Sequence, residues 1–457
     1  MNKNISVLRY LKIRNIRDRI RYQRWANFIE KSQWWNRDEF DRYQWEKVSG
    51  LLEHSYRHVP YYTEVFRSIG AKPEDFKSWE DFYKFPFLTK DIVRERATDL
   101  ISALANTSKL QYYTTGGSTG VPLGLYKRRG SVVSRAFMDQ QWKRVGYSEK
   151  SKRVILRGEP VQNGKIYKKY PFSNDWVLSS YNLSENTIQK YVDFLNKIKP
   201  EFLHVYPSSL YIFSRLLENS GLTLSFSPKA ILCGSEPVRQ YQRELFEKTF
   251  GSRVYSWLGM SEGVIMAGEC EYSSIYHSWP QLSHVEILSE NNIHVQALGE
   301  MGEIVGTSLH NYTFPFIRYK TADKAEFHGI GCDKCKRHFL LLSKIDRWQQ
   351  EVIVSKNGVY VSATGLNPHS EIFNNVIQFQ FIQKIPGEII LLLVRKEAYS
   401  QIDTEKIINE FRSKLSDEFE IKIEFADFIP RTSSGKHRYL RQELDLQLIN
   451  NPEEPIN

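Results

Sequence analysis

The sequence lacks any run of about 18 consecutive apolar residues, the length that a membrane-spanning helix requires. Residues Met1 to Phe28 also lack the apolar stretch and small-residue cleavage site of a secretory signal. We therefore expect a cytoplasmic protein with no transmembrane segment. Cysteine is scarce as well: four among 457 residues, unevenly spaced, do not make a disulfide framework.

The chain carries no RNA-binding or helix-turn-helix signature, although its net charge is +10. Most of the excess lies in residues 1–28, where eight Lys and Arg side chains face only Asp18. Apolar residues recur there at helical spacing and predict a basic amphipathic helix. The helix fits two interpretations, a solvated helix packed on the main body or a weak contact with an anionic membrane surface. Nucleic-acid binding is favoured by net charge alone.

Hydrophobic residues make up 41% and charged residues 25%, which is typical of a globular protein. The aromatic-rich region from Trp25 to Tyr83 predicts helices separated by turns. After about Leu110, short β-rich runs alternate with helical stretches and predict a layered α/β fold. The expected strands are Arg153–Leu156, Phe202–Val205 and Ala230–Cys233, and the expected helices are Glu185–Lys197, Ser208–Asn219 and Val238–Phe250.

The composition changes near Lys344 to Trp348, after which one βαβ-like unit fills the chain. Its expected elements are a strand over Ile389–Val394, a helix over Asp403–Leu415 and a strand over Ile421–Phe425. We therefore predict a basic N-terminal helix over residues 1–28, a large domain over 29–345 and a small α+β domain over 346–457. No internal repeat is present.

A loop rich in glycine and hydroxyl side chains spans Tyr113 to Pro122. Its three glycines let the backbone approach a ligand closely, and its hydroxyls donate hydrogen bonds at several angles, which suits a phosphate group. The Gly-Lys-Ser/Thr ending of a nucleotide P-loop is absent. By itself, the loop fits either a phosphate site or a plain surface loop.

Four further segments follow this loop in a fixed order. They are Gly234-Ser235-Glu236-Pro237, Leu258-Gly259-Met260-Ser261-Glu262, Tyr319-Lys320-Thr321-Ala322-Asp323 and Pro430-Arg431-Thr432-Ser433-Ser434-Gly435-Lys436. In this order the five segments resemble the adenylate-forming superfamily. The nearest likeness is to phenylacetate-coenzyme A ligases and to their relatives encoded with capsule and other surface-polysaccharide genes. Two features support that branch, the N-terminal Pro60-Tyr61-Tyr62 and the Asn357-Gly358 turn.

The resemblance implies a role for each motif. Lys436, Glu262 and Thr115 would be catalytic, with Lys436 bridging the carboxylate and the transferring phosphate and Glu262 holding Mg²⁺. Asp323 and Arg347 would contact the ribose. The other nucleotide-binding residues implied are Thr114, Gly116, Gly117, Ser118, Thr119, Gly120, Ser235, Glu236, Pro237, Trp257, Gly259 and Ser261. By residue type alone, Glu262 could equally cap a helix, Asp323 lie in a solvated turn and Lys436 lie on the surface.

The chain departs from the superfamily pattern at several positions. Leu258 stands where an aromatic ring would stack on adenine, and Trp257 stands one position earlier. Lys320 replaces arginine and Ala322 replaces glycine in the third segment. At the domain junction, Ile345-Asp346-Arg347-Trp348 replaces a Gly-Arg signature, so Asp346 is our choice for the hinge. None of these changes removes a group that adenylation requires.

The cysteines suggest a metal site. Cys332 and Cys335 enclose a knuckle-like turn that lets two thiolates point at one ion. This pair is half of a site, and Cys270 with His277 could complete a Cys₃His set. The phenylacetate ligase branch that the chain resembles has a similar structural zinc site. A redox role has less support because no thioredoxin-like pattern surrounds the pair; Cys233, in an apolar run, is expected in the core.

The resemblance implies an adenylate-forming ligase with a mobile C-terminal lid. ATP·Mg²⁺ and a carboxylic acid would yield an acyl-adenylate, which would then pass its acyl group to coenzyme A. Two alternatives stay open: transfer to an amine or hydroxyl of a sugar or amino acid, and a catalytically silent binding protein. The candidate walls of the acid pocket are Tyr206–Ser208, Gly234–Pro237 and Trp257–Met260, and they admit an aryl or a polar acid. The oligomeric state stays open, although relatives are often dimers.

Overall fold

The computed structural model describes residues 16–115, 123–128, 132–159, 161, 164–171, 173–346, 352–366, 371–415, 417–430, 439–444 and 446. The chain forms two compact units. The first combines Met1–Thr115, Leu123–Gly146 and Ser256–Arg347, and the second combines Gly116–Pro122, Tyr147–Tyr255 and Trp348–Asn457. The predicted α/β architecture is confirmed.

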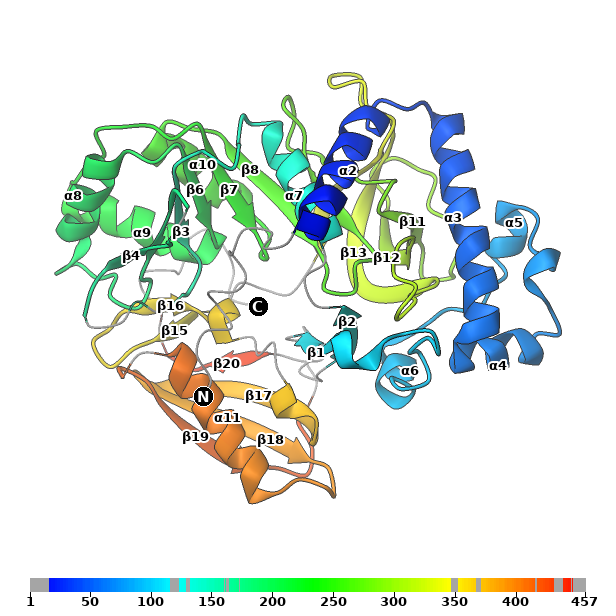
Figure 1. The fold of residues 1–457 in the computed structure, drawn as a ribbon. Helices are drawn as coiled ribbons and strands as arrows, with labels where there is room; N and C mark the ends of the chain where they lie inside the picture. Colours follow the sequence, from blue (N-terminus) through cyan, green and yellow to red (C-terminus); the bar gives the residue numbers. More distant parts are fainter. Residues whose placement is uncertain are drawn as a thin grey trace. The chain divides into compact units, whose positions relative to one another are not determined.

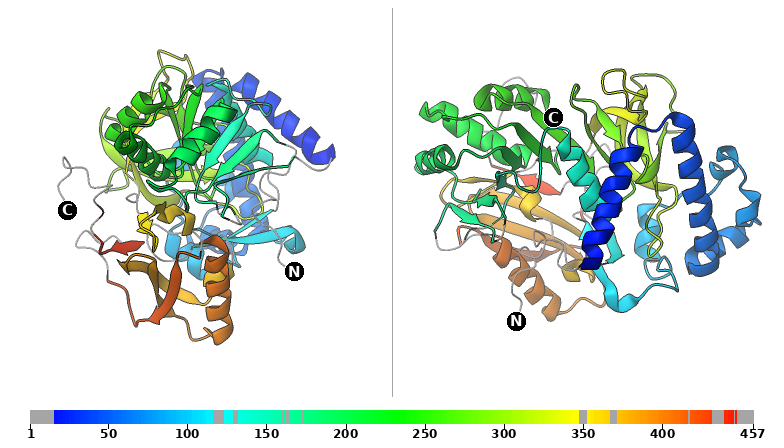
Figure 2. Two further views of the ribbon diagram at one scale, coloured as in Figure 1. Left: turned by 90° about the vertical axis from the view of Figure 1, so that its left-hand side faces the viewer. Right: turned by 45° about the horizontal axis from the view of Figure 1, so that its top comes forward.

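Helices form the N-terminal part of the first unit, as its aromatic-rich sequence predicts. Helix α2 (Ile16–Ser32) lies along α7 (Val132–Lys143), and Ile29 and Phe137 are fully buried in the apolar cluster beneath them (Figures 1 and 2). The described part of the predicted basic helix therefore packs on a neighbour and continues to Ser32; residues 1–15 lie outside the described residues. The other helices are α3 (Arg37–His58), α4 (Pro60–Ser68), α5 (Trp79–Phe82) and α6 (Lys90–Glu95), with 3₁₀ turns at Pro73–Asp75 and Thr107–Lys109.

No helix in the described part of the chain combines the length and the apolarity that crossing a membrane requires.

The strands of the first unit follow one another in the order β11-β12-β13-β14-β10-β9-β8, and each neighbouring pair is antiparallel. Their bounds are β8 (Val254–Gly259, of which the last four residues belong to this unit), β9 (Met266–Glu269), β10 (Tyr276–Ser278), β11 (Ser283–Leu288), β12 (Met301–Ser308), β13 (Tyr319–Ile330) and β14 (Leu340–Asp346). A separate antiparallel hairpin pairs β1 (Leu110–Thr115) with β2 (Leu123–Arg128).

The second unit contains the parallel strands that the sequence predicts. Strands β7, β6, β3 and β5 are parallel neighbours in this order, and β4 is antiparallel at the edge. Their bounds are β3 (Arg153–Leu156), β4 (Tyr167–Lys169), β5 (Asp175–Leu178), β6 (Phe202–Val205) and β7 (Ala230–Gly234). Helices α8 (Ile188–Ile198), α9 (Pro207–Ser220) and α10 (Gln240–Phe250) cover one face (Figure 1). Pro207 begins α9, and Gly221 ends it with a left-handed φ of 66°, which glycine adopts without strain.

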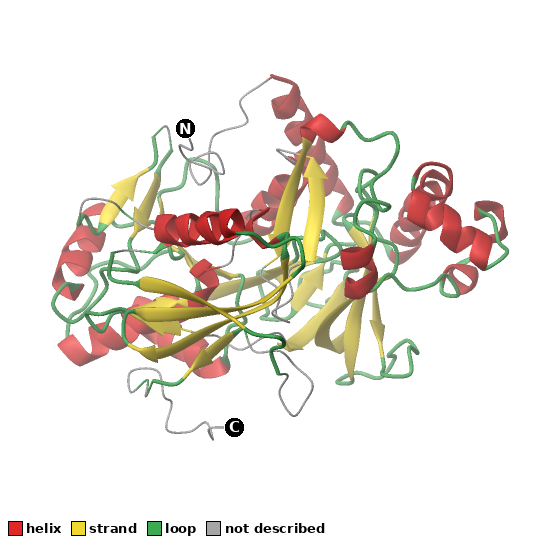
Figure 3. Ribbon diagram, turned by 90° about the horizontal axis from the view of Figure 1, so that it is seen from below, coloured by secondary structure: helices red, strands yellow, loops and turns green. Residues whose placement is uncertain are grey.

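The C-terminal part of the second unit is the expected α+β structure. Its sheet has the order β19-β18-β17-β20, and Ile407 and Phe411 of α11 (Gln401–Lys414) pack on it (Figure 3). The strands are β17 (Val376–Ile385), β18 (Glu388–Arg395), β19 (Glu420–Phe425) and β20 (Leu440–Gln442), with 3₁₀ turns at Ala363–Leu366 and Glu371–Phe373. A hairpin of β15 (Val352–Val354) and β16 (Tyr360–Ser362) precedes them and contains the predicted Asn357-Gly358 turn.

A buried ion pair joins distant segments of the first unit. The Arg318 guanidinium donates to Glu286 through Nε at 3.0 Å and through Nη2 at 2.8 Å, and both side chains are almost fully buried. Its Nη1 donates to the carbonyls of Tyr83 and Phe85. The backbone of Leu88 then bonds to the start of β13 on both sides of Tyr319. The pair thus fixes the segment before α6 against β13.

Glu286→Gln should lower the free energy of unfolding by about 3–5 kcal/mol, because it leaves the Arg318 charge buried without a counter-charge. Urea denaturation of the full chain measures the change. The matched control is Glu290→Gln, since Glu290 is 90% exposed in its ion pair with Lys324, and it should cost less than about 1 kcal/mol. Equal shifts in the two variants would contradict this account.

A histidine lies against the same ion pair. The His284 ring stacks on Trp79 with centroids 4.2 Å apart, and burial lowers the pKa of His284 to about 4 from 6.5, with smaller contributions from charges on Glu286, His294 and Arg318. The folded state therefore holds His284 neutral at a pH where the unfolded chain is already protonated.

The contribution of His284 to the free energy of unfolding should therefore be fully present above about pH 6.5. It should decrease by about 3 kcal/mol in total as the pH falls toward 4. His284→Phe keeps an aromatic ring but removes the titrating group, so its stability should fall less steeply across this interval. Chemical denaturation at a series of pH values measures both slopes. Identical slopes for the two proteins would contradict the assignment of this pH dependence to His284.

Candidate functional site

Glu262 lies in the turn that follows β8 in the first unit. Gly263 has a φ of 73° and its N–H donates to the Met260 carbonyl, which closes this turn. The Glu262 carboxylate is about 9% exposed and accepts a hydrogen bond from the Tyr319 hydroxyl at 3.4 Å. Burial raises the pKa of Tyr319 well above its usual value, so its hydroxyl remains a donor.

Asp323 lies on β13, which begins at Tyr319, directly after Arg318. Its backbone N–H donates to Thr321 Oγ1 at 3.1 Å. Ala322 has a left-handed φ of 62°, which accounts for a glycine at this position of the superfamily pattern. The Ala322 N–H donates to Glu303 Oε1 at 2.9 Å, and this bond helps to hold the unfavourable conformation.

Lys90 is a charged neighbour that the sequence did not reveal. It is the first residue of α6, directly after Thr89, whose hydroxyl caps the helix by accepting from Ile92 N–H. Burial lowers the pKa of Lys90, and the nearby carboxylates of Asp323 and Glu262 act in the opposite direction. The first unit therefore gathers two carboxylates, an ammonium group and a phenol. The register of Leu88 against Tyr319, together with the Arg318 contacts described above, brings Lys90 there, and no local motif predicts it.

The strand before Glu262 carries the other candidates of this unit. The Trp257 ring lies over Gly259, where an added Cβ would come within 2.6 Å of the ring. Gly259 is therefore required for this ring position. The Trp257 indole N–H is buried, and no described residue accepts its hydrogen. Ser261 follows in the turn.

The predicted residues of the second unit lie at the carboxyl end of β7. Ser235 has a φ of 70°, and its hydroxyl accepts from Arg157 Nη2 at 2.7 Å. The buried Glu236 carboxylate accepts from the backbone N–H and hydroxyl of Ser208, both at 2.9 Å, and from the Ser362 hydroxyl at 2.7 Å. Glu236 thus ties α9 to the β15–β16 hairpin, a structural role that its motif did not predict. Pro237 follows Glu236.

Several predicted residues cannot be placed. The backbones of Thr114, Thr115 and Asp346 lie in β1 and β14, but their side chains are outside the described residues. The other candidates outside the described residues are Gly116, Gly117, Ser118, Thr119, Gly120, Arg347 and Lys436.

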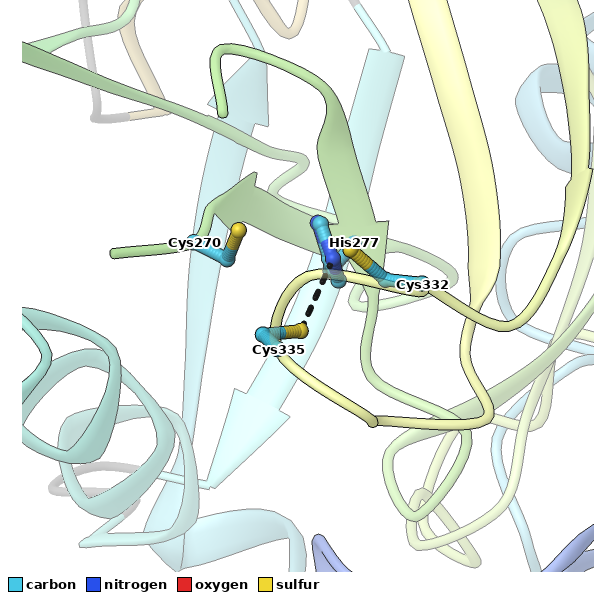
Figure 4. Close-up of side chains that lie close together, drawn as sticks. All are labelled: Cys270, His277, Cys332 and Cys335. Atoms are coloured by element: carbon cyan, nitrogen blue, oxygen red, sulfur yellow. Dashed lines mark hydrogen bonds between the residues drawn. The ribbon is translucent and has the colours of Figure 1, made fainter. Parts of the chain in front are cut away.

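The predicted Cys₃His set comes together in the first unit. The donor atoms of Cys270, His277, Cys332 and Cys335 all lie within 4.8 Å of one another (Figure 4). They come from the end of β9, from β10 and from the turn between β13 and β14. Cys335 Sγ lies 3.3 Å from His277 Nε2. Ligand atoms of a tetrahedral zinc with Zn–S bonds of about 2.3 Å would be about 3.8 Å apart, so the set is close to that size.

The surroundings of this cluster suit a cation. His277 Nδ1 lies 2.9 Å from the Ile275 carbonyl, an acceptor that requires a hydrogen on Nδ1 and leaves the Nε2 lone pair toward the cysteines. The Cys335 thiol lowers the pKa of Cys270 by hydrogen bonding, and the same contact raises the pKa of Cys335. A thiolate at Cys270 is therefore favoured, and thiolates are the form in which cysteine binds a metal ion.

Residues 353–443 match the protein family described as the CapK C-terminal domain. Over 365 residues, the chain is 25% identical to protein CapK of Staphylococcus aureus, covering 78% of this chain and 79% of that protein. Over 292 residues, it is 26% identical to phenylacetate-coenzyme A ligase of Escherichia coli strain K12, covering 63% and 67%.

The fold is similar to solved structures of 2-hydroxyisobutyryl-CoA ligase. The structure in the postadenylation state, in complex with R3-HIB-AMP, matches with a TM-score of 0.56 at 16% identity and covers 90% of this chain and 91% of that one. The structure with 2-HIB-AMP and CoA in the thioesterification state matches with a TM-score of 0.55 at 16% identity and covers 90% and 92%. The chain is thus homologous to CapK and to the phenylacetate-coenzyme A ligases, and its fold is similar to that of a coenzyme A ligase solved with acyl-adenylates, as the order of its motifs predicts.

Proposed function

We propose that the protein activates a carboxylic acid as its acyl-adenylate, with release of pyrophosphate, and transfers the acyl group to coenzyme A. The observation that carries the proposal is the group of Glu262, Asp323 and Lys90 in the first unit. Two buried carboxylates beside an ammonium group suit a nucleotide, because ribose hydroxyls and phosphate oxygens need acceptors and cations respectively. Trp257 adds a buried indole N–H for which no described residue is an acceptor.

Glu262 is our candidate ligand for Mg²⁺. Mg²⁺ prefers oxygen ligands and is usually held by one or two carboxylates together with substrate phosphates, so a single buried glutamate fits. When bound, the ion would offset charge on the phosphate oxygens. Tyr319 would hold the Glu262 carboxylate in place through its hydroxyl, and Asp323 would accept from the ribose. Lys436, Thr115 and the loop from Thr114 to Gly120 keep the roles that the resemblance implies, with Arg347 at the ribose.

Coenzyme A is the proposed acceptor because the relatives that match over most of the chain include coenzyme A ligases. A role in surface-polysaccharide biosynthesis is proposed from the similarity to CapK. An amine or hydroxyl acceptor remains the alternative. A cytoplasmic location, a homodimer and a weak membrane contact of the basic N-terminal helix also remain predictions.

We further propose that Cys270, His277, Cys332 and Cys335 hold a structural zinc ion. The mutual distances of the donors and the hydrogen bond that orients His277 support it. Zinc would tie the turn after β13 to β9 and β10, three segments that are distant in the sequence. The role is structural because all four ligands come from the protein, which leaves no position for a substrate.

Glu262→Gln should reduce ATP–pyrophosphate exchange by about 10²–10³-fold, because it removes a charge where a cation and phosphate must be held. The wild-type protein is incubated with ATP, Mg²⁺, labelled pyrophosphate and a panel of carboxylic acids. Lys436→Ala should cause a loss of similar size. The exposed Glu290→Gln variant is the control and should exchange at the wild-type rate.

Absence of exchange with every acid would support the catalytically silent alternative. Where exchange occurs, addition of coenzyme A, amines or sugars identifies the acceptor by the product formed.

Protein purified without chelator should contain about one zinc ion per chain, as four protein ligands require. Cys335→Ser should lose the metal and lower the melting temperature, since one thiolate ligand is removed. Cys233→Ser, which changes a buried cysteine of β7 outside the cluster, should keep its zinc. Mass spectrometry measures the zinc content of the wild type and of both variants. Metal-free wild-type protein would refute the site.

A further inference from the structure

One face of the parallel strands in the second unit carries a cluster of polar residues at its carboxyl end. In register, Ile155 pairs with His204, and Leu156 pairs with Val205. Side chains alternate between the two faces of a strand, so His204, Tyr206 and Arg157 share one face. Leu156 and Val205 lie on the other, inside the apolar cluster with α8 and α9. Crevices at the carboxyl ends of parallel strands are where open α/β sheets bind ligands.

Arg157 is the cation of this face, and its neighbours are neutral. Its guanidinium carbon lies 4.6 Å from the centre of the Tyr206 ring. Nη1 lies 3.0 Å from His204 Nε2, and Nη2 donates to Ser235 Oγ at 2.7 Å. Because a guanidinium group only donates hydrogen bonds, His204 Nε2 must be the acceptor, and the histidine that meets Arg157 is neutral. The contacts orient the guanidinium group without neutralising it.

No acidic side chain among the described residues forms an ion pair with Arg157, and its Nε is buried without an acceptor. Arg157 is half-buried, and three more deeply buried arginines of the chain are paired differently. Arg153, Arg318 and Arg337 each donate two hydrogen bonds to one carboxylate. A half-buried arginine that is held by neutral groups, with donors left over, can pair with an external anion, because a partly desolvated charge is stabilised when it is paired.

We propose that Arg157 binds a second anionic group on the acyl substrate, so that the acid activated by this protein is a dicarboxylic acid or an acid with another oxyanion. The proposal rests on the proposed function. Ser235 and Tyr206, which hold Arg157, belong to the two segments of this unit that we expect to line the acid pocket. The oxyanion would accept from the hydrogens of Nη1 and Nη2 that are not given to His204 and Ser235. A neutral acid of the same shape would leave these donors unpaired, which penalises its binding.

The test compares acids that differ by a second anionic group: adipate with hexanoate, terephthalate with 4-methylbenzoate, and 3-phosphonopropionate with butanoate. Pyrophosphate exchange gives kcat and KM for each acid with the full-length protein. The wild type should favour the charged member of at least one pair by about tenfold or more in kcat/KM. Arg157→Gln should abolish this preference by raising KM for the charged acid, and Arg157→Lys should restore part of it.

Arg215→Gln is the matched control, because Arg215 lies on α9 of the same unit in an exposed ion pair with Glu218. It should leave the preference unchanged. A preference for neutral acids in the wild type would overturn the proposal. An equal loss for all acids in Arg157→Gln, or a rise only in KM for ATP or coenzyme A, would also overturn it, since the anion would then be a phosphate of those substrates.

Calorimetric binding of the same six acids separates this proposal from the proposed function. If no acid supports exchange, the ligase activity fails, and the charge preference is then judged by binding alone. Tighter binding of a charged acid that is lost in Arg157→Gln supports the role of Arg157. Failure of the wild type to bind any charged member more tightly than its neutral partner refutes it.

Discussion

The Arg318 guanidinium, buried and balanced by Glu286, holds the first unit in the arrangement on which its candidate site depends. Its donors reach the carbonyls of Tyr83 and Phe85, so one side chain joins β11, the start of β13 and the segment that leads to α6. The backbone bonds of Leu88 across Tyr319 extend this connection. As a result, the charge of Asp323 acts to raise the pKa of Lys90, although the two residues are more than 200 positions apart in the sequence.

Three deeply buried arginines are matched by carboxylates within the protein. Arg318 pairs with Glu286, whereas Arg153 and Arg337 pair with Asp175 and Glu271 and stabilise the fold. The charges of Asp323 and Glu262 act on Lys90, whereas half-buried Arg157 is held by neutral partners. These two cations belong to the candidate nucleotide group and to the carboxyl ends of the parallel strands, where we expect a ligand.

The departures from the superfamily pattern have local physical reasons. Ala322 adopts the left-handed conformation that glycine would adopt, and Glu303 accepts the hydrogen bond of its N–H. Trp257 stands one position before the residue where the pattern has an aromatic side chain, and its ring lies over Gly259. Glu236 accepts hydrogen bonds from serines of α9 and of the β15–β16 hairpin, so its motif serves at least in part to join structural elements.

Local sequence determined much of the fold. The strands Arg153–Leu156 and Phe202–Val205 form with the predicted bounds, and α9 and α11 differ from their predicted ranges by one or two residues at either end. Apolar periodicity, proline and glycine act over a few residues, and they are visible in a single sequence. The same holds for the five motifs, whose order predicts the resemblance to the adenylate-forming superfamily, and for the cysteine pair, whose spacing predicts half of a metal site.

Tertiary structure decided the rest, because pairing between distant segments leaves no local signature. The gathering of Cys270 and His277 with the cysteine pair depends on β10 lying between β9 and β14. Lys90 reaches Glu262 and Asp323 only through the register of Leu88 against Tyr319. In the sequence, nothing distinguishes Arg157 from a surface arginine. Three parallel strands bring neutral side chains around it, and among the described residues no carboxylate forms an ion pair with it. Local propensity thus set the elements, whereas strand register and charge burial set which side chains meet.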